Sequence, residues 1–339
     1  MITTRDGIRA RARLHTIGAY VPERVMTNAD FEQILETSDE WIVSRTGIRQ
    51  RHIAAEDQTT ASLGEACARD IIERAGIDPM DIDILIVATA TPEYLFPSTA
   101  CVIQERIGAM RAACYDSLAA CSGFVYALGQ ANAYIESGMA KTVLVLGAET
   151  LSRIADFNDR STAILFGDAA AGALIVAGDE TYTGFLGFEL GADGTGAKDL
   201  GVKVGGSACP ANRPHERSDE FLFMNGREVF KFATRVIIDS TRRVLDATGL
   251  TMDDIDLFVP HQANTRIIDH AVEKLGIDPA KVVVNVDRYG NTSSASVPLA
   301  LAEARDQGRL KPGDLILMIA FGGGLTWGSS IVRYEPEAA

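Results

Sequence analysis

The sequence has few cysteines, and their spacing excludes functions that depend on paired cysteines. Five occur among 339 residues, none of them in a CxxC pair, at positions Cys67, Cys101, Cys114, Cys121 and Cys209. An odd, unpaired set of this kind does not fit a disulfide framework or a structural zinc site, and it is typical of a reducing compartment. We therefore expect no metal site and a cytoplasmic location.

Long apolar runs and a positive net charge are absent too. No run approaches the roughly 18 apolar residues of a membrane-spanning helix, and the basic N-terminal segment has no apolar stretch before Leu14. The sequence therefore predicts neither a membrane protein nor a secretory signal. A formal net charge of −14 argues against general nucleic-acid binding. A phosphate-cradling nucleotide loop of the GxxxxGK(S/T) type is also missing.

What the sequence does contain is an alternation of strand-like and helix-like segments. Hydrophobic residues make up 47% of the chain, which is enough for a large core. Residues 82–88 and 142–146 are almost continuously apolar, as in strands buried on both faces. Residues 97–107 and 122–137 have the pattern of helices. This alternation predicts an α/β fold of layered sheets and helices.

The second half of the chain repeats the pattern of the first. Residues 68–87 and 241–260 each read as a helix, a glycine stop, and a strand that opens with Asp-Ile-Asp. We interpret this as an internal duplication, with halves at residues 1–180 and 181–339 and a site where they meet. Chance similarity between two helix–strand units is the alternative. Residues 191–217, rich in Gly, Pro, Ser and Asn, form either a functional loop or a plain linker.

Residues 116–124 (DSLAACSGF) place Cys121 between a strand end and a helix start. The unpaired N–H groups and the positive dipole at a helix N-terminus favour a thiolate over a thiol. The position therefore predicts a lowered pKa and a nucleophilic sulfur. The small neighbours Ala119, Ala120 and Gly123 leave room for a bulky substrate. A buried structural cysteine is the alternative.

Three segments of the second half are candidates to meet this cysteine. His261, in PHQAN, follows the predicted strand 257–259, at the strand end where ligands bind in α/β sheets. Asn291, in YGNTSSAS, follows the predicted strand 282–286. The glycine-rich turn FGGGLTWG, at 321–328, lets a backbone N–H approach a substrate closely. The alternatives are a structural histidine, a helix-capping asparagine and a simple strand connection.

Together, the motifs DSLAACSGF, PHQAN, YGNTSSAS and FGGGLTWG resemble, in this order and spacing, the β-ketoacyl-acyl-carrier-protein synthase III family. The resemblance extends to TSDEWIVSRTGIRQRH, TPEYLFPSTA, NDRSTAILFGDAAAG and MNGREVFKFA, and so to nearly the whole chain. It implies a thiolase-like fold and the initiating condensation of fatty-acid synthesis. In that reaction an acyl-CoA primer and malonyl-acyl-carrier protein give 3-oxoacyl-acyl-carrier protein. Asn291 distinguishes this family from thiolases, which use a second cysteine, and from elongating synthases, which use two histidines.

The resemblance also implies roles for individual residues. Cys121 would attack the acyl-CoA, while His261 and Asn291 would donate hydrogen bonds to the enolate that forms when malonyl-carrier loses CO2. Backbone N–H groups of Cys121 and Gly323 would hold the tetrahedral oxyanion, so neither a metal nor a cofactor is expected. One alternative is a related acyltransferase or condensing enzyme of a secondary, polyketide-like pathway. Another is a non-catalytic assembly partner, against which the intact triad counts.

Further matched positions concern binding. The family uses the positions matching Thr37, Trp41, Arg45, Arg160 and Asn264 to bind CoA, Phe96 to reach the acyl pocket of the neighbouring subunit in a homodimer, and Lys231 and Arg266 to dock the carrier. Trp41 and Arg45 are four positions apart in a predicted helix and so share a face, as do Arg227, Lys231 and Arg235. A core tryptophan and a solvated basic face without a partner are the alternatives. The sequence does not fix the primer, because one methylene changes the binding free energy by only about 1–3 kcal/mol.

Overall fold

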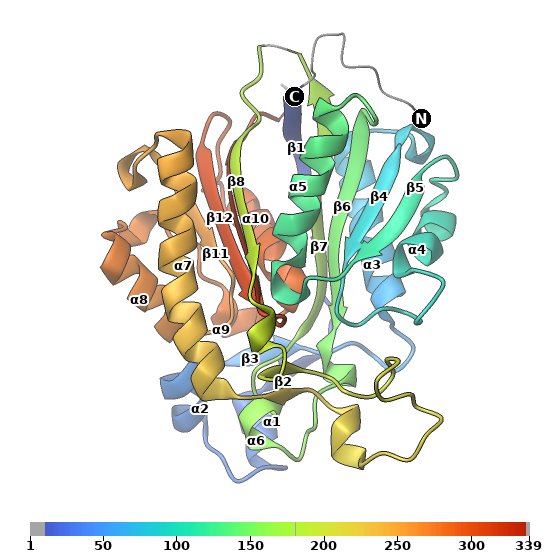
Figure 1. Cartoon of the computed structure of the whole chain (residues 1–339), viewed down its shortest axis with the longest axis vertical. Coiled ribbons are helices and arrows are strands. Elements are labelled where there is room, and N and C mark those ends of the chain that lie inside the picture. The colour runs from blue at the N-terminus through green and yellow to red at the C-terminus, as the bar shows by residue number, and fades with distance from the viewer. Residues whose placement is uncertain (1–10, 180, 337–339) are drawn as a thin grey trace.

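The computed structural model describes residues 11–179 and 181–336, which form two main β-sheets (Figure 1). The first sheet has the strand order β1 (Arg11–Tyr20), β7 (Asp168–Gly178), β6 (Thr142–Thr150), β4 (Ile84–Ala88) and β5 (Ala113–Ser117). The second has the order β8 (Phe185–Ala192), β13 (Thr326–Arg333), β12 (Leu315–Gly322) and β11 (Leu257–Pro260). Most of the N-terminal segment that is predicted to lack a secretory signal lies outside the described residues.

The two sheets repeat one pattern of strand directions. In the first sheet β4 and β6 are parallel, whereas β6 with β7 and β7 with β1 are antiparallel. In the second sheet β11 with β12, β12 with β13 and β13 with β8 follow the same succession of directions. The structure therefore confirms the predicted fold class of duplicated α/β halves.

Helices form three layers around the two sheets (Figure 1). The layers are α5 (Gly123–Glu136) and α10 (Ser296–Asp306) between the sheets, α3 (Thr60–Ala75) and α4 (Thr99–Ile107) outside the first, and α7 (Gly226–Thr248) and α8 (Thr265–Leu275) outside the second. Side chains of β12 alternate between layers. Ile316 and Met318 belong to the central core, whereas Leu317 and Ile319 pack with α7 and α8. Both faces of such strands are buried, which explains their continuous apolar runs.

Glycines end four of these helices, including the two glycine stops predicted in the repeated units, Gly76 and Gly249. Gly76, Gly108, Gly249 and Gly276 follow α3, α4, α7 and α8 in the left-handed conformation, with φ between 64° and 80°. Each of their N–H groups donates to a carbonyl of the last helical turn. A larger residue would be strained there, which is why the stop is glycine. No helix in the described part of the chain is both long and apolar enough to cross a membrane.

The structure contradicts one predicted strand. Residues 282–286 contribute only an isolated bridge, and the short helix α9 (Val286–Tyr289) begins at their end. The physical reason is the buried side chain of Gln262. Its oxygen accepts hydrogen bonds from the N–H groups of Asn285 and Val286 at 2.9 and 3.2 Å. These groups are therefore bonded to a side chain and do not join a strand ladder.

Smaller elements lie together at one end of the molecule, the bottom of Figure 1. They are β2 (Val25–Thr27), α1 (Asn28–Glu32), α2 (Asp39–Thr46), β3 (Gln50–His52), α6 (Arg160–Ala163), β9 (Leu200–Gly201) and β10 (Phe223–Met224). β9 pairs with β10. The predicted loop 191–217 is partly structured, because its first two residues extend β8 and its middle contains β9.

Candidate active site

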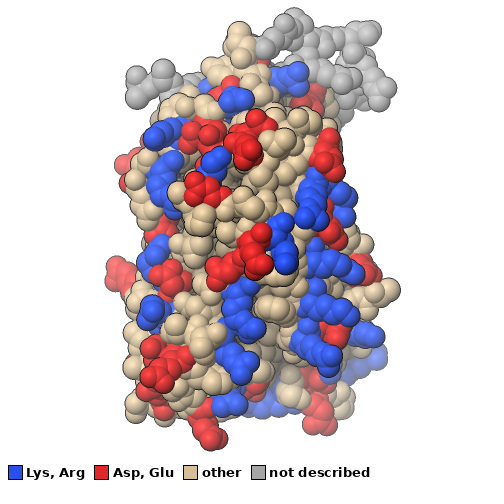
Figure 2. Space-filling model, turned by 90° about the vertical axis from the view of Figure 1, so that its left-hand side faces the viewer, with Lys and Arg blue, Asp and Glu red and all other residues tan. Residues whose placement is uncertain are grey.

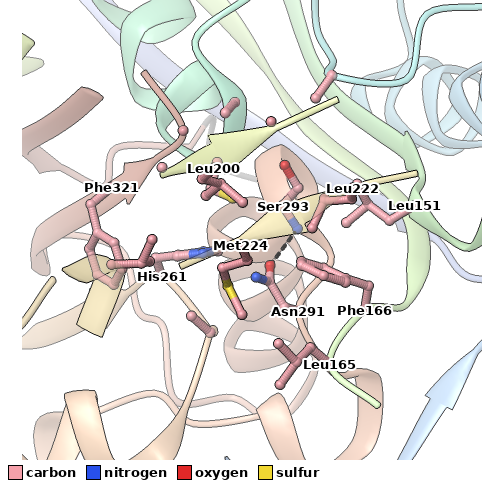
Figure 3. Close-up of a pocket in the computed structure, with 18 of the residues that line it drawn as sticks. Leu151, Leu165, Phe166, Leu200, Leu222, Met224, His261, Asn291, Ser293 and Phe321 are labelled. Carbon is pink, nitrogen blue, oxygen red and sulfur yellow. Dashed lines mark hydrogen bonds between the residues drawn. The ribbon is translucent and has the colours of Figure 1, made fainter. Parts of the chain in front are cut away.

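One cavity of about 550 Å³ lies between the two halves of the fold. Most of the side chains that face it are apolar, among them Leu200, Leu222 and Phe166 (Figure 3). The polar side chains on its lining are Cys121, His261, Asn264, Asn291, Ser293 and Thr326. Nowhere in residues 11–179 and 181–336 do three or more His, Cys, Asp or Glu side chains gather in a way that suits a metal ion.

Cys121 lies in the 3-10 turn Ala120–Ser122, between β5 and the start of α5. Its thiol is not in a disulfide bond, and the residue as a whole is partly exposed although its sulfur is buried. A Cβ atom added to Gly322 would lie 2.6 Å from the Cys121 nitrogen, which is closer than real side chains approach, so this position requires glycine. The glycine-rich turn can therefore pack against the Cys121 backbone because residue 322 is glycine, a position that the sequence did not single out. Gly323 follows it and lines the cavity.

The direction predicted for the pKa of Cys121 is wrong. Burial of the sulfur raises this pKa to about 12, and the Glu149 carboxylate adds to the increase. Hydrogen bonds with the side chains of Ser293 and Asn291 act in the opposite direction without cancelling it. The position before a helix does not outweigh the loss of water around the sulfur. The thiol is therefore the resting form at neutral pH.

Two strained backbone positions border the site. Among the described residues other than glycine, only Ala120 and Ser293 have positive φ angles, 44° and 50°. Ala120 immediately precedes Cys121, and Ser293 follows Asn291 by two positions. Strain of this kind costs about 1–3 kcal/mol and persists where the surrounding structure imposes it, often at functional sites. The fold thus holds both segments in unusual conformations at the same cavity.

His261 directly follows β11 and is 2% exposed. Its backbone N–H donates to the Ile319 carbonyl at 2.7 Å, and its Nδ1 lies 2.5 Å from the Ser296 hydroxyl oxygen. The rings of His261 and Phe321 meet edge to face, with their centres 5.2 Å apart. Figure 3 shows the imidazole directed into the cavity, toward Asn291. Burial lowers the pKa of His261 to about 3, so the ring is neutral at physiological pH.

Asn291 belongs to the second half but is held by the first. Its N–H donates to the Leu165 carbonyl at 2.8 Å, and its carbonyl accepts from the Gly167 N–H at 3.0 Å. Its side-chain oxygen accepts from the Ser293 N–H at 2.8 Å (dashed line in Figure 3). The Asn291 side chain also acts on Cys121, whose pKa it lowers. The three side chains singled out in the sequence therefore meet in one cavity.

A buried carboxylate, Glu149 on β6, lies behind the site and was not predicted. It is fully buried and accepts hydrogen bonds from the hydroxyls of Thr91 and Ser294 at 2.7 and 2.8 Å. Burial outweighs these bonds, so the pKa of Glu149 is raised. The contact with Ser294 ties the turn after Asn291 to the first sheet. An acidic residue inside the apolar run TVLVLGAET was the sequence signal for it.

Four of the five residues matched to CoA binding contact one another beside the cavity, namely Trp41, Arg45, Arg160 and Asn264. The guanidinium carbons of Arg160 and Arg45 lie 4.7 and 5.9 Å from the centre of the Trp41 ring. Trp41 and Arg45 thus share a face of α2, as predicted. Asn264 donates to the Arg45 carbonyl at 2.9 Å and is the member of the cluster that lines the cavity. The hydroxyl of Thr37 is buried without a hydrogen-bond partner, which leaves a polar group for a ligand to satisfy.

Lys231 on α7 and Arg266 on α8 are exposed. Figure 2 shows the side of the molecule on which α7 and α8 lie in Figure 1. The guanidinium carbon of Arg266 lies 5.3 Å from the centre of the Phe230 ring, and Phe230 lines the cavity. Arg227 and Arg235 are also exposed on α7. Figure 2 shows Lys and Arg side chains gathered on the lower right of this face, with acidic side chains between them. Arg266 therefore contacts a residue that lines the cavity, and Lys231 directly follows that residue on α7.

Phe96 is not part of the cavity of its own chain. It is 86% exposed, and its neighbour Leu95 is 82% exposed. Leu118, close in sequence to Cys121, is 78% exposed and lines the cavity. All three are large apolar side chains that this chain by itself leaves exposed.

A duplicated α/β fold that brings a cysteine, a histidine and an asparagine to one cavity between its halves defines a thiolase-fold acyltransferase of the condensing type. The family models for 3-oxoacyl-(acyl-carrier-protein) synthase III and for its C-terminal part match residues 115–194 and 245–334. The β-ketoacyl-(acyl-carrier-protein) synthase III of Agrobacterium fabrum is 52% identical over 328 residues, which cover 96% of this chain and 99% of that protein. The chain belongs to this family of condensing enzymes, which initiate fatty-acid synthesis.

Solved structures agree with this assignment. The β-ketoacyl-(acyl-carrier-protein) synthase III of Thermus thermophilus is 52% identical, with a TM-score of 0.89 over 96% of this chain and 100% of that chain. The priming β-ketosynthase of the R1128 polyketide pathway is 36% identical, with a TM-score of 0.90 over 98% and 99%. The predicted family, fold and acyltransferase class are therefore confirmed.

Proposed function

We propose that the chain transfers a short acyl group from an acyl-CoA to malonyl-acyl-carrier protein through an acyl-cysteine on Cys121. The observation that supports this most directly is the convergence of Cys121, His261 and Asn291 on one largely apolar cavity. The apolar lining suits an acyl chain, and the polar groups gather around the sulfur. The two halves that supply them are residues 1–180 and 181–339, divided between β7 and β8 in this proposal.

In the first half-reaction the Cys121 sulfur attacks the thioester carbon of the acyl-CoA. The sulfur loses its proton as the new S–C bond forms, and the departing CoA thiolate gains one, so protons and charge balance. Backbone N–H groups of Cys121 and Gly323 hold the tetrahedral oxyanion. The hydrogen bonds from Ser293 and Asn291 stabilise the Cys121 thiolate, which burial alone disfavours.

In the second half-reaction the bound malonyl group loses CO2 and leaves an enolate on its thioester oxygen. His261 and Asn291 donate hydrogen bonds to that oxygen, and one donor of this kind typically contributes about 3–4 kcal/mol. The enolate carbon attacks the acyl carbonyl, the bond to Cys121 breaks, and the departing thiolate takes a proton from solvent, the one proton that the overall reaction consumes. Hydrogen bonds thus stabilise both oxyanions, and the mechanism calls for no metal or organic cofactor.

The substrates are proposed to bind on two neighbouring surfaces. CoA lies against the cluster of Thr37, Trp41, Arg45, Arg160 and Asn264, and the carrier protein lies against Lys231 and Arg266. The cation–π contacts of Trp41 and the buried hydroxyl of Thr37 support the first placement. The exposure of Lys231 and Arg266 beside the cavity supports the second.

We also propose a cytoplasmic homodimer in which Phe96 reaches the acyl pocket of the partner subunit. Its support is the exposed apolar surface around Phe96, which a single chain leaves in water.

Mass spectrometry of Cys121 after incubation with a panel of acyl-CoAs tests the function and identifies the primer. We expect an acyl adduct on Cys121 that is converted to 3-oxoacyl-carrier when malonyl-carrier is added. An acyltransferase of a secondary pathway that lacks decarboxylation would form the adduct but release no CO2. A non-catalytic assembly partner would form no adduct. Either of these results would overturn the proposal.

A further inference from the structure

The Ser296 hydroxyl contacts the ring nitrogen of His261 that faces away from the cavity. Its oxygen lies 2.5 Å from Nδ1, and the two residues are 1% and 2% exposed. Ser296 is the first residue of α10, the helix packed between the two sheets. The main chain of His261 is fixed by its hydrogen bond to Ile319. Both partners are therefore held by the core of the fold, so their contact is a built feature of the site.

The hydrogen-bond partners of Ser296 settle the direction of this bond. The backbone N–H of Gln262, which can only donate, points at the Ser296 oxygen at 3.4 Å. Among the described residues, the other partner of that oxygen is Nδ1 of His261. If Nδ1 carried a proton and donated, the oxygen would accept twice and its own proton would be buried without an acceptor, which is unfavourable. If the hydroxyl donates to Nδ1, every group is satisfied.

We propose that Ser296 is a positioning residue whose hydroxyl donates to Nδ1 of His261 and so holds the neutral ring with its proton on Nε2, facing the cavity. In this tautomer His261 presents an N–H group to the enolate oxygen and no basic nitrogen to Cys121. The opposite tautomer would direct a lone pair into the cavity, which would repel the enolate and could accept a proton from the thiol. The consequence rests on the proposed function, whereas the tautomer is a property of the free protein.

The residues around His261 hold its ring and the Ser296 hydroxyl in fixed positions relative to each other. The side-chain amide of Gln262 donates to the carbonyls of Pro260 and Val283 at 2.8 and 3.0 Å, which fixes the direction of the Gln262 main chain. The low pKa that burial gives His261 keeps the ring uncharged at neutral pH. Only the choice between two neutral forms is therefore left, and Ser296 makes that choice.

Nitrogen-15 NMR of histidine-labelled protein at neutral pH tests the tautomer without any substrate. A protonated and an unprotonated ring nitrogen resonate far apart, and the His261 signals are those missing from His261→Ala. We expect the unmodified protein to show a protonated Nε2 and an unprotonated Nδ1. A protonated Nδ1 would overturn the proposal and would instead make His261 an acceptor for the Cys121 proton. We expect Ser296→Ala to shift the population away from the Nε2–H form and Ser296→Thr, which keeps the hydroxyl, to restore it.

The two half-reactions supply the functional test. Ser296→Ala should lower malonyl decarboxylation by about 10–100-fold, the cost typical of losing a partner that orients a histidine. Acylation of Cys121 should change much less, and Ser296→Thr should recover most of the loss. Ser329→Ala, which removes another fully buried hydroxyl on β13, is the matched control and should leave the ratio of the two rates unaltered.

The outcomes separate this inference from the proposed function. Equal losses in both half-reactions of Ser296→Ala, with the tautomer unchanged, would assign Ser296 a merely structural role and overturn the inference. A protonated Nε2 in a protein that releases no CO2 from malonyl-carrier would leave the tautomer standing and overturn the proposed function instead.

Discussion

At the scale of single residues, the reactivity of Cys121 depends on two opposing effects. Burial of its sulfur disfavours the thiolate, whereas nearby hydrogen-bond donors favour it. Because burial raises the pKa of Cys121 above the ordinary thiol value of about 8.5, little thiolate exists at neutral pH. Raising the pH should increase the thiolate fraction about tenfold per unit. We expect alkylation of Cys121 by iodoacetamide to accelerate without levelling off between neutral pH and about pH 10.

Mass spectrometry of the peptide that contains Cys121 measures this rate, and Cys121→Ala shows the background from the other four cysteines. A rate that levels off below about pH 8 would mean that the helix start lowers the pKa after all.

The close approach of Gly322 to Cys121 gives a second prediction. In Gly322→Ala the new Cβ would collide with the Cys121 nitrogen, from which an ideal position lies 2.6 Å away. A displacement of about 1 Å at a reacting group can cost about 100-fold in rate, so we expect a loss of this size in acylation. Gly323→Ala is the matched control, since its Cβ would lie 3.5 Å from Leu200 and its N–H is retained. Similar losses in both variants, at equal helical content, would refute the steric explanation.

The partners of Cys121 should separate the two half-reactions. His261→Ala and Asn291→Ala should each lower malonyl decarboxylation by about 100–1,000-fold, because each removes a donor to the enolate. His261→Ala should still acylate Cys121 at a near-normal rate. Asn291→Ala should acylate more slowly, because the amide that hydrogen-bonds to the sulfur is lost. Quantifying acyl-Cys121 and released CO2 in parallel checks both, and a variant that decarboxylates normally has no role at the enolate.

At this scale, the sequence predicts the site residues that lie in a motif, but it does not predict the residues that contact them in the folded structure. Cys121, His261 and Asn291 stand in recognisable local patterns. Glu149 and Ser296 act on the site across long sequence separations, so their roles follow only from the folded structure. The pKa of Cys121 was predicted in the wrong direction for the same reason, since its distance from water is a tertiary property.

At the scale of elements, prediction succeeded where an apolar run ended at a clear stop. The strand at residues 82–88 and the helices that end at Gly76 and Gly249 were recognisable because local pattern and tertiary burial agree. The strand expected at 282–286 is wrong because one buried side chain, that of Gln262, takes the backbone N–H groups that a ladder would need. The apolar pattern of a segment does not show that a distant side chain will bond to its backbone N–H groups.

The basic residues of α7 and α8 give a prediction about the carrier protein. The chain is strongly acidic, so an acidic carrier needs a local positive surface, and such a surface can raise association rates by about 10–1,000-fold in a salt-dependent way. We expect Lys231→Glu combined with Arg266→Glu to raise the KM for malonyl-carrier and to flatten its dependence on salt. Acylation of Cys121 by a small acyl-CoA should change much less.

The same helices offer a matched control. Arg242→Glu combined with Lys274→Glu changes the charge of α7 and α8 equally, but these residues lie near the C-terminal ends of the two helices. Steady-state kinetics over a range of salt concentrations should leave this control close to the unmodified protein. If both double variants raised the KM alike, net charge rather than docking would be responsible.

At the scale of the whole molecule, the exposed surface around Phe96 predicts a dimer. Light scattering should give twice the mass of one chain at working concentration. Because Phe96 is proposed to narrow the acyl pocket of the partner subunit, Phe96→Thr should admit longer acyl-CoAs to Cys121. Met110→Thr, at another exposed apolar residue (61% exposed), should leave the chain-length preference as it was. A monomer, or an unchanged preference in Phe96→Thr, would count against this arrangement.

The bonds that fasten Asn291 to the first half have a consequence for how the molecule fails. The N–H of Asn291 is bonded to Leu165, and Ser294 is bonded to Glu149, so the alignment of the site is set along the seam between the halves. A slight slip along that seam would separate Cys121 from His261 while every helix and strand stayed folded. The turnover rate should thus detect a displacement between the two halves that a measurement of secondary structure would miss. On warming, the turnover rate should therefore fall at a lower temperature than the one at which the helices and strands unfold.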